Sequence, residues 1–158
     1  MSDPAVPPVP FETTLFVRDH CLCLHAQRAA RAVARRFDEA LRPVGLKSGQ
    51  FSLLMSLNRP APPTIGSVAE LLAMDRTTLT ANLKPLERRG LLTVKPDGRA
   101  RRLTLTDAGR ALLAAATPIW RETHEAIEAE LDPGAPDALR RGLVALSGGG
   151  SRVAGAAA

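Results

Sequence analysis

The feature that most constrains the fold is a pair of alternating apolar segments in the sequence LLTVKPDGRARRLTLT, residues 91–106. Leu92 and Val94 share one face of the first segment, and Leu103 and Leu105 share one face of the second. Since residues two apart lie on the same face of a strand, each segment predicts a half-buried strand. The intervening PDGRA is rich in turn-forming residues, and Gly98 is free to adopt a positive φ. The pattern predicts a β-hairpin.

Two helical segments joined by a tight turn precede this hairpin. The first is predicted to begin at Thr64 or Ser67 and to run through Leu72, and it is followed by the short sequence AMD. Asp75 is a suitable N-cap for the next helix, which runs to about Arg89 and stops at Gly90. A short helix, a turn, a second helix and a hairpin in this order predict a winged helix-turn-helix, whose second helix fits the major groove of DNA.

Positive charge is concentrated in the same part of the chain. The window from Arg76 to Arg102 holds eight basic and two acidic residues, a charge of +6, whereas the whole chain carries +5. The remaining residues therefore sum to −1. A localised excess of this kind indicates an anionic partner, nucleic acid first, although on charge alone a solvated arginine face remains an equal alternative.

The two flanks of this module are predicted to be helical. Apolar residues between Leu22 and Ala40 recur every three or four positions, as on one face of a long helix. Thr106 caps a second long helix, which Pro118 should kink. The predicted fold class is mainly α with a small β-hairpin wing. One domain is predicted at 14–147, between a flexible Pro-rich arm at 1–13 and a disordered tail at 148–158. Within this domain, the winged helix-turn-helix covers about 48–106, and the dimerisation helices cover about 14–42 and 107–147.

The predicted recognition helix divides into an inward and an outward face. Leu79, Leu83 and Leu86 are spaced to pack inward, against Leu72 of the preceding helix. The polar residues on the other face are suited to contact bases and phosphates, and two arginines of the hairpin can reach a minor groove. The predicted DNA-binding residues are Arg76, Thr77, Thr78, Asn82, Lys84, Arg99 and Arg101.

Two segments carry a resemblance to a known family. The helix-turn-helix of the MarR family of transcriptional regulators is similar to the segment SVAELLAMDRTTLTANLKPLERRGLL. The wing and the following helix of that family are similar to the segment DGRARRLTLTDAGRALL. The resemblance extends over roughly residues 14–147, and its specific part is the wing pattern. It implies a homodimer that binds a pseudo-palindromic DNA site. It also implies that Asp97 orders the wing by pairing with an arginine, with Arg101 as the expected partner, and that Arg99 enters the minor groove.

The sequence departs from an ideal recognition helix at Pro85. Proline removes one helical hydrogen bond, so the helix is expected to bend after its first half, beyond the residues that read DNA. A dimer also follows from the residues themselves. Long helices with apolar stripes at both ends of the chain exceed what a winged module needs as cover, and symmetric pairing buries them.

The two cysteines lie two residues apart in DHCLCLHAQR. If both lie on one helix, Cys21 and Cys23 point to opposite flanks, so no disulfide between them is expected. Cys21 shares a flank with His25, but two ligands do not make a zinc site, and no metal or cofactor is expected. Organic-hydroperoxide sensors of the MarR family carry a reactive cysteine in a similar segment, which makes Cys23 the redox candidate. Those sensors hold the thiolate with tyrosines, and this chain has none.

The family precedent also places an effector pocket between the dimerisation helices and the winged module, with His25, Arg28, Trp120 and His124 as the expected lining. Packing in the core is an equal alternative for Trp120. The predicted function is a dimeric, sequence-specific transcriptional regulator, a repressor released by a small molecule or an oxidant. A thiol sensor acting through Cys23 and a nonspecific, chromatin-like DNA binder are alternatives.

Other classes of protein are disfavoured. The chain contains no phosphate-binding loop, nucleophile elbow or paired-carboxylate motif of an enzyme. It has no apolar run long enough to cross a membrane, and its N-terminus lacks the apolar segment of a signal peptide. Two cysteines in a chain that is not secreted favour a reducing, cytoplasmic location.

Overall fold

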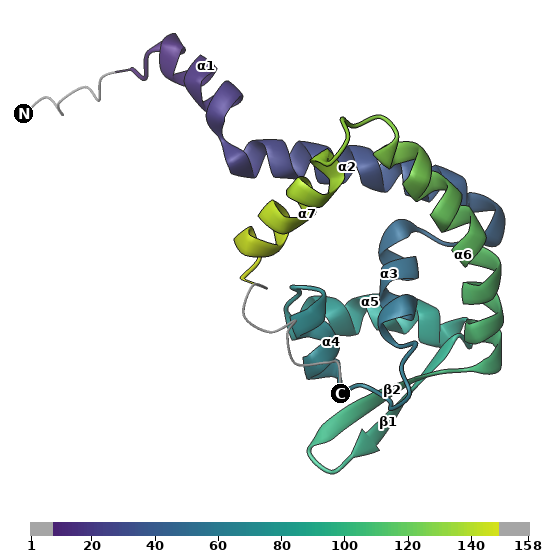
Figure 1. Ribbon diagram of the computed structural model, residues 1–158. Coiled ribbons are helices and arrows are strands. Elements are labelled where there is room, and N and C mark those ends of the chain that lie inside the picture. Colours follow the sequence, from purple (N-terminus) through teal and green to yellow (C-terminus); the bar gives the residue numbers. More distant parts are fainter. Residues whose placement is uncertain (1–7, 149–158) are drawn as a thin grey trace, which may run out of the picture.

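The computed structural model describes residues 8–148 (Figure 1). These residues form helices joined by short connections, with one antiparallel hairpin, which confirms the predicted fold class. The elements are α1 (Phe11–His20), α2 (Leu22–Leu41), the 3₁₀ helix η1 (Arg42–Val44), α3 (Ser48–Ser56), α4 (Ile65–Leu71), α5 (Arg76–Arg88), β1 (Leu92–Asp97), β2 (Ala100–Leu105), α6 (Asp107–Glu128) and α7 (Ala135–Leu146).

The single long helix predicted from about Thr14 to Leu41 is wrong, because the chain breaks at Cys21. This residue has an extended backbone, with φ −72° and ψ 105°. Its N–H donates to the carbonyl of Val17 at 3.0 Å, which ends α1, and its Sγ accepts the N–H of Leu24 at 3.4 Å, which caps α2. The apolar stripe that predicted the helix begins at Leu22 and so belongs to α2 alone.

The predicted ends of the domain also shift. Helix α1 begins at Phe11, inside the segment expected to be a flexible arm, because Pro10 supplies a φ of −59° directly before it. The rest of that arm, residues 1–7, and all of the predicted tail except Gly148 lie outside the described residues. Neither internal proline ends its helix, since α5 continues through Pro85 and α6 through Pro118, although α6 curves along its length (Figure 1).

The core of the winged module is made of leucines from several elements. Leu79, Leu83 and Leu86 of α5 are buried, as predicted, and Leu72 is half-buried against them. The hairpin register pairs Leu92 with Leu105 and Val94 with Leu103, so that its base adds leucines to the same core. Full burial of one such side chain stabilises a fold by about 1.5–3 kcal/mol.

The hairpin is fixed at two places. The N–H of Leu103 donates to the carbonyl of Pro63 at 2.9 Å, which holds the loop before α4 against β2. At the other end, Thr106 caps α6 by accepting the N–H of Gly109 at 3.0 Å, and its hydroxyl donates to the carbonyl of Gly90 at 2.6 Å. The direction of α6 is therefore set by the base of the wing.

The flanking helices lie above the winged module in Figure 1. Helix α6 packs against α2 and α3, and Arg36 of α2 makes two hydrogen bonds to Glu130, of 2.8 and 2.6 Å, just beyond the end of α6. These bonds hold the pKa of the Glu130 carboxyl below its usual value. Helix α7 turns back from this end and is held by the ion pair of its Arg140 with Glu128 of α6, while Asp137 of α7 pairs with the same guanidinium. Among the described residues, no helix has the length and apolarity that a membrane span requires.

We predict that Gly109→Ala destabilises the protein. A Cβ added at Gly109 would lie 2.0 Å from the carbonyl oxygen of Leu91, and this contact is with main chain that cannot rotate away. Relief of such a clash typically costs about 1–3 kcal/mol. The free energy of unfolding, measured by urea denaturation, should fall by that amount.

Gly142→Ala is the matched control. Gly142 also lies in a helix, and a Cβ there would meet no atom within 4 Å. Alanine at this site should stabilise the protein by up to about 1 kcal/mol, because it is the better helix former. Equal effects of the two substitutions would contradict the role assigned to Gly109.

Candidate nucleic-acid interface and effector sites

The turn before α5 fixes the start of the predicted recognition helix. Ala73 has a φ of 50°, in the left-handed region, which allows the N–H of Met74 to reach the carbonyl of Ala69 at 2.9 Å. Asp75 then caps α5, accepting the N–H of Thr78 at 2.8 Å and its hydroxyl at 2.6 Å. Both hydrogen bonds hold the pKa of Asp75 below its usual value, and the bond from the hydroxyl has the larger effect. The charged carboxylate therefore fixes the first turn of α5.

The predicted DNA-binding residues of α5 are all exposed, but they differ in how far their side chains are already engaged within the protein. The side chains of Thr77 and Lys84 make no hydrogen bond or ion pair with residues 8–148. The hydroxyl of Thr78 already donates to Asp75. The guanidinium of Arg76 lies over Gly66 of α4, with one nitrogen 3.2 Å from the position of a Cβ there. Asn82 lines a cleft of about 310 Å³ whose wall includes the first turn of α3.

The wing is ordered by a different arginine from the one expected. Asp97 pairs with Arg102, whose Nε donates to Oδ2 at 2.6 Å, and not with Arg101. The register explains the correction, because Asp97 lies opposite Ala100 and Arg101 lies opposite Pro96. Side chains alternate along a strand, so Arg102 shares a face of the hairpin with Asp97 and Arg101 lies on the other face. Counting from the turn at Gly98 would have identified this arginine from the sequence.

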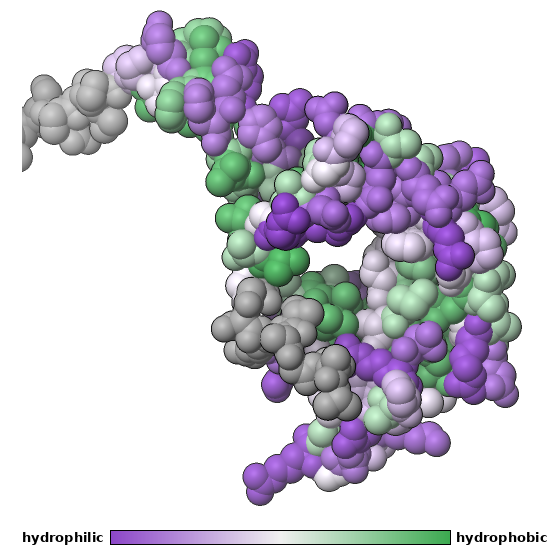
Figure 2. Space-filling model, in the orientation of Figure 1, coloured by the Kyte–Doolittle hydropathy of each residue, from purple (hydrophilic) through white to green (hydrophobic). Residues whose placement is uncertain are grey.

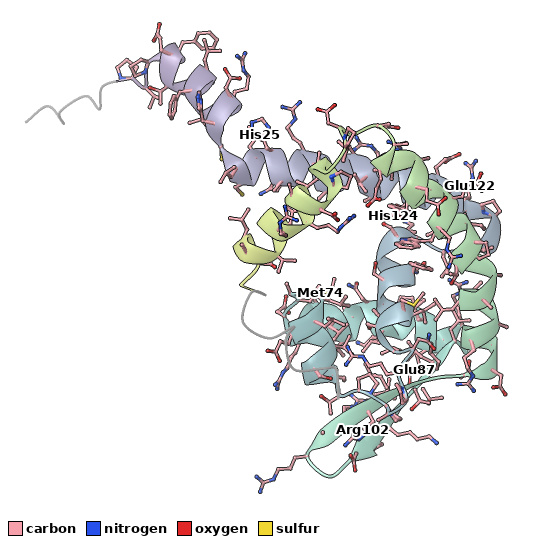
Figure 3. All side chains as sticks on the ribbon, in the orientation of Figure 1. His25, Met74, Glu87, Arg102, Glu122 and His124 are labelled. Carbon is pink, nitrogen blue, oxygen red and sulfur yellow. The ribbon has the colours of Figure 1, made fainter. Side chains whose placement is uncertain are left out.

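Arg102 also joins the wing to the rest of the module. Its Nη1 donates to the carbonyl of Pro62 at 2.9 Å, and residue 102 forms an isolated bridge with Thr64. Figure 3 shows Arg102 on the hairpin beside the loop that precedes α4. Arg99 occupies the tip of the hairpin and is exposed, next to Gly98 with its φ of 57°. The tip therefore projects from a hairpin that is anchored near its middle.

The basic charge of the module remains largely unneutralised. Of the eight basic residues from Arg76 to Arg102, only Arg102 has a carboxylate partner within the described range. Figure 2 shows hydrophilic residues covering the hairpin. A surface that keeps its positive charge next to an exposed helix face is suited to bind the phosphates of DNA.

Trp120 is the centre of an aromatic cluster between the two parts of the domain. Its ring stacks with those of Phe37 of α2 and Phe51 of α3, at centroid distances of 6.3 and 5.9 Å. His124 stacks on it at 4.8 Å, and its Nε2 lies 3.1 Å from a carboxylate oxygen of Glu128. The cluster connects the core of the winged module to the end of α6, where Arg140 of α7 is held.

An open groove of about 390 Å³ lies beside Trp120. Apolar side chains of α3 and α4, including Met55 and Leu71, line it together with Arg59. His25 and Arg28 do not line this groove but a separate one on α2. The structure thus brings together two of the four expected effector residues, Trp120 and His124, and places the other two elsewhere.

The cysteines differ in their surroundings. Cys21 is partly buried at the cap of α2, so the premise that both lie on one helix is wrong. Cys23 is exposed, and its Sγ accepts a hydrogen bond of 3.1 Å from the side-chain amide of Gln27. Arg31 in turn donates to the amide oxygen of Gln27 at 3.3 Å. In the part of the chain that the structure describes, no three His, Cys, Asp or Glu side chains are grouped to hold a metal ion.

We predict that Arg102→Ala loosens the wing. The substitution removes the bonds to Asp97 and Pro62, both made by a half-exposed side chain. The protein should lose no more than about 1 kcal/mol of stability, because exposed ion pairs contribute little. Amide hydrogen exchange in β1 and β2 should nevertheless become faster.

Arg101→Ala tests whether this effect is specific to Arg102. Arg101 is exposed on the neighbouring position and makes neither contact. Its removal should leave hydrogen exchange in the hairpin unchanged. If Arg101→Ala accelerates exchange and Arg102→Ala does not, the assignment of the wing-ordering arginine is wrong.

Comparisons with known proteins agree with this geometry. The model of the MarR family matches residues 44–103. The chain is similar to the transcriptional regulator MosR of M. tuberculosis in complex with DNA, with 36% identity over 81% of this chain and 94% of that chain and a TM-score of 0.74. It is also similar to the transcriptional repressor CouR bound to a 23-mer DNA duplex, with 30% identity, 83% and 95% coverage and a TM-score of 0.73.

A second structure of CouR, from Rhodococcus jostii RHA1 and bound to p-coumaroyl-CoA, matches with 20% identity, 82% and 93% coverage and a TM-score of 0.71. At this identity the likeness concerns the fold. A search of curated proteins by sequence found no match.

Proposed function

Because the chain belongs to the MarR family of transcriptional regulators, we propose that it is a dimeric repressor that binds a pseudo-palindromic DNA operator and releases it in response to a signal. The observation that carries the proposal is the exposed, unneutralised positive charge of α5 and the wing. Arginine and lysine that lack acidic partners release the counterions of DNA when they bind phosphates, and this release drives association. Relatives crystallised with DNA duplexes support the same partner.

The dimer is supported by apolar surface that one chain leaves uncovered. Phe11 of α1, Leu22 of α2 and Leu146 of α7 are 69%, 67% and 66% exposed. Figure 2 shows hydrophobic residues at the junction of α1 and α2 and on α7. A symmetric pair buries such a surface, and its two winged modules then match the symmetry of an operator.

The protein acts in this proposal by binding and not by catalysis, in the cytoplasm where its DNA lies. Arg76, Thr77 and Thr78 approach the DNA with the first turn of α5, and Asn82 and Lys84 follow on the next turns. Arg99 enters the minor groove from the wing tip, and Arg101 contacts phosphate from the face of the hairpin opposite Asp97. The exposure of these side chains supports the assignment.

We predict that Arg99→Ala weakens operator binding and lowers the salt dependence of the affinity. Arg99 in the minor groove places its positive charge between the phosphates that line the groove, and removing this charge should reduce the slope of log K against log salt by about one. The measurement is fluorescence anisotropy with duplexes from the region upstream of the gene, at a series of salt concentrations. Arg121→Ala is the control, since Arg121 is exposed on α6 without a carboxylate partner in the described range.

The same titrations separate the alternatives. Equal affinity for operator and for random duplex of the same length would favour a nonspecific, chromatin-like binder. Absence of binding to any duplex would contradict both readings. An unchanged slope for Arg99→Ala would remove this residue from the DNA interface.

We infer that a small-molecule effector binds in the groove beside Trp120. Its apolar walls, with Met55 and Leu71, suit a flat or aliphatic group, and Arg59 suits a carboxylate or another anion at its rim. A ligand there contacts α3, α4 and α6 together, so it can change how the winged module is held against α6. CouR, which has a similar fold, is crystallised with p-coumaroyl-CoA, so a small molecule can bind to a protein of this fold.

An oxidant is the second candidate signal, favoured by the environment of Cys23. Its sulfur accepts a hydrogen bond from Gln27, which is itself bonded by the cationic Arg31. The sulfur is also exposed, so that a hydroperoxide can reach it. The thiolate attacks an organic hydroperoxide, the S–O bond forms as the O–O bond breaks, and the alkoxide leaves and is protonated to the alcohol, which leaves a sulfenic acid on Cys23.

We predict that an organic hydroperoxide releases the operator from the wild-type protein but not from Cys23→Ser. Cys21→Ser serves as the control, because Cys21 caps α2 and is partly buried. Operator affinity before and after treatment is measured by anisotropy. If the wild type and Cys23→Ser respond alike, sensing through Cys23 is wrong, while the operator-binding proposal stands.

A further inference from the structure

Three arginines gather along the exposed face of α2, far from the wing. Arg28, Arg31 and Arg35 line an open groove of about 580 Å³, with the small side chains of Ala29 and Ala32 between them. All of them are exposed. Figure 3 shows His25, at the end of this groove, on the side of the molecule opposite Arg102 of the hairpin.

The acidic residues of the same segment do not neutralise these arginines. Asp19 pairs with the arginine before it at 2.6 Å, and Glu39 pairs with Arg42 at 2.6 Å. Asp38 accepts the main-chain N–H of Ser48 at 2.7 Å and so caps α3. Each of these three carboxylates is thus engaged elsewhere, and the groove formed by the three arginines keeps its full positive charge.

The arginines of the described residues divide into those with and those without a carboxylate partner. Six arginines among residues 8–148 have carboxylate partners, including Arg36, the remaining arginine of α2. The arginines without such partners are concentrated in the winged module and in the groove. Like charges three and four residues apart on a helix repel each other, so the free groove costs stability that an anion would restore.

We propose that this groove binds a small molecule that carries two or more phosphate groups, such as a nucleotide or a phosphorylated coenzyme. The planar fork of arginine binds phosphate oxygens through two parallel hydrogen bonds. Arg28 and Arg35 lie two helical turns apart, about 10 Å along the axis, with Arg31 between them, so the three forks span more than one phosphate. The alanines leave room for the anion to approach the helix.

The position of the groove separates this binding from the recognition of DNA. The predicted DNA-binding residues belong to α5 and the hairpin, at the other end of the domain (Figure 1). A ligand in the groove therefore leaves the DNA face free. The inference requires neither operator binding nor the effector groove beside Trp120.

The test is isothermal titration calorimetry of the full chain with inorganic pyrophosphate, in the absence of DNA. Arg28→Gln/Arg35→Gln removes two charges but keeps polar side chains of similar length. It should weaken binding by about tenfold or more, since charge-assisted hydrogen bonds are worth roughly 1.4 kcal/mol or more each. Arg28→Lys/Arg35→Lys keeps the charge without the fork and should fall between this variant and the wild type.

Arg121→Gln/Arg141→Gln is the matched control, because these two arginines of α6 and α7 are also exposed without carboxylate partners in the described range. It should bind pyrophosphate like the wild type. Equal losses in the control and the groove variant, or no binding of pyrophosphate by the wild type, would overturn the proposal. So would a groove variant that binds pyrophosphate normally but loses affinity for random duplex DNA, since the groove would then be a nucleic-acid surface.

Folding of the groove variant is checked by its circular dichroism and thermal transition. Pyrophosphate should raise the transition temperature of the wild type and of the control but not that of the groove variant. This readout measures binding to the folded state and is independent of the heat of titration. Failure of this test leaves the operator experiments untouched, because they involve different residues.

Discussion

Where the base of the wing meets α6, main-chain groups approach each other more closely than a side chain would allow. Gly109 lies against the carbonyl of Leu91, which also accepts the N–H of Thr106 at 3.1 Å. Thr106 caps α6 and donates to Gly90, directly after α5. This one point therefore fixes the C-terminal end of α5, the base of the hairpin and the start of α6. The first turn of α6 is thus in direct contact with the DNA-binding module.

The aromatic cluster around Trp120 is the second connection between the two parts of the domain. Rings from α2, α3 and α6 stack there, and His124 continues the contact to Glu128, which holds α7 through Arg140. The proposed effector groove beside Trp120 is lined by the same α3 that contributes to the core of the winged module.

Ion pairing divides the arginines of the molecule into two groups. Those that fix the architecture, such as Arg36, Arg102 and Arg140, have carboxylate partners. Those on α5, on the wing tip and in the groove of α2 do not, within residues 8–148. Exposed pairs add little to stability, but they determine which positive charges remain to meet an anionic partner.

The sequence by itself determined the winged module, because its signals are local. Alternation gave the strands, the leucine spacing gave the buried face of α5, and Asp75 and Thr106 were recognisable caps. Only the tertiary structure decided the break at Cys21, because the cap that replaces the helix there involves a sulfur and an N–H that no periodicity reveals. It also separated His25 and Arg28 from Trp120 and His124, and tied Arg102 to Pro62. Those outcomes depend on distances between segments remote in the chain, which packing fixes and sequence spacing does not.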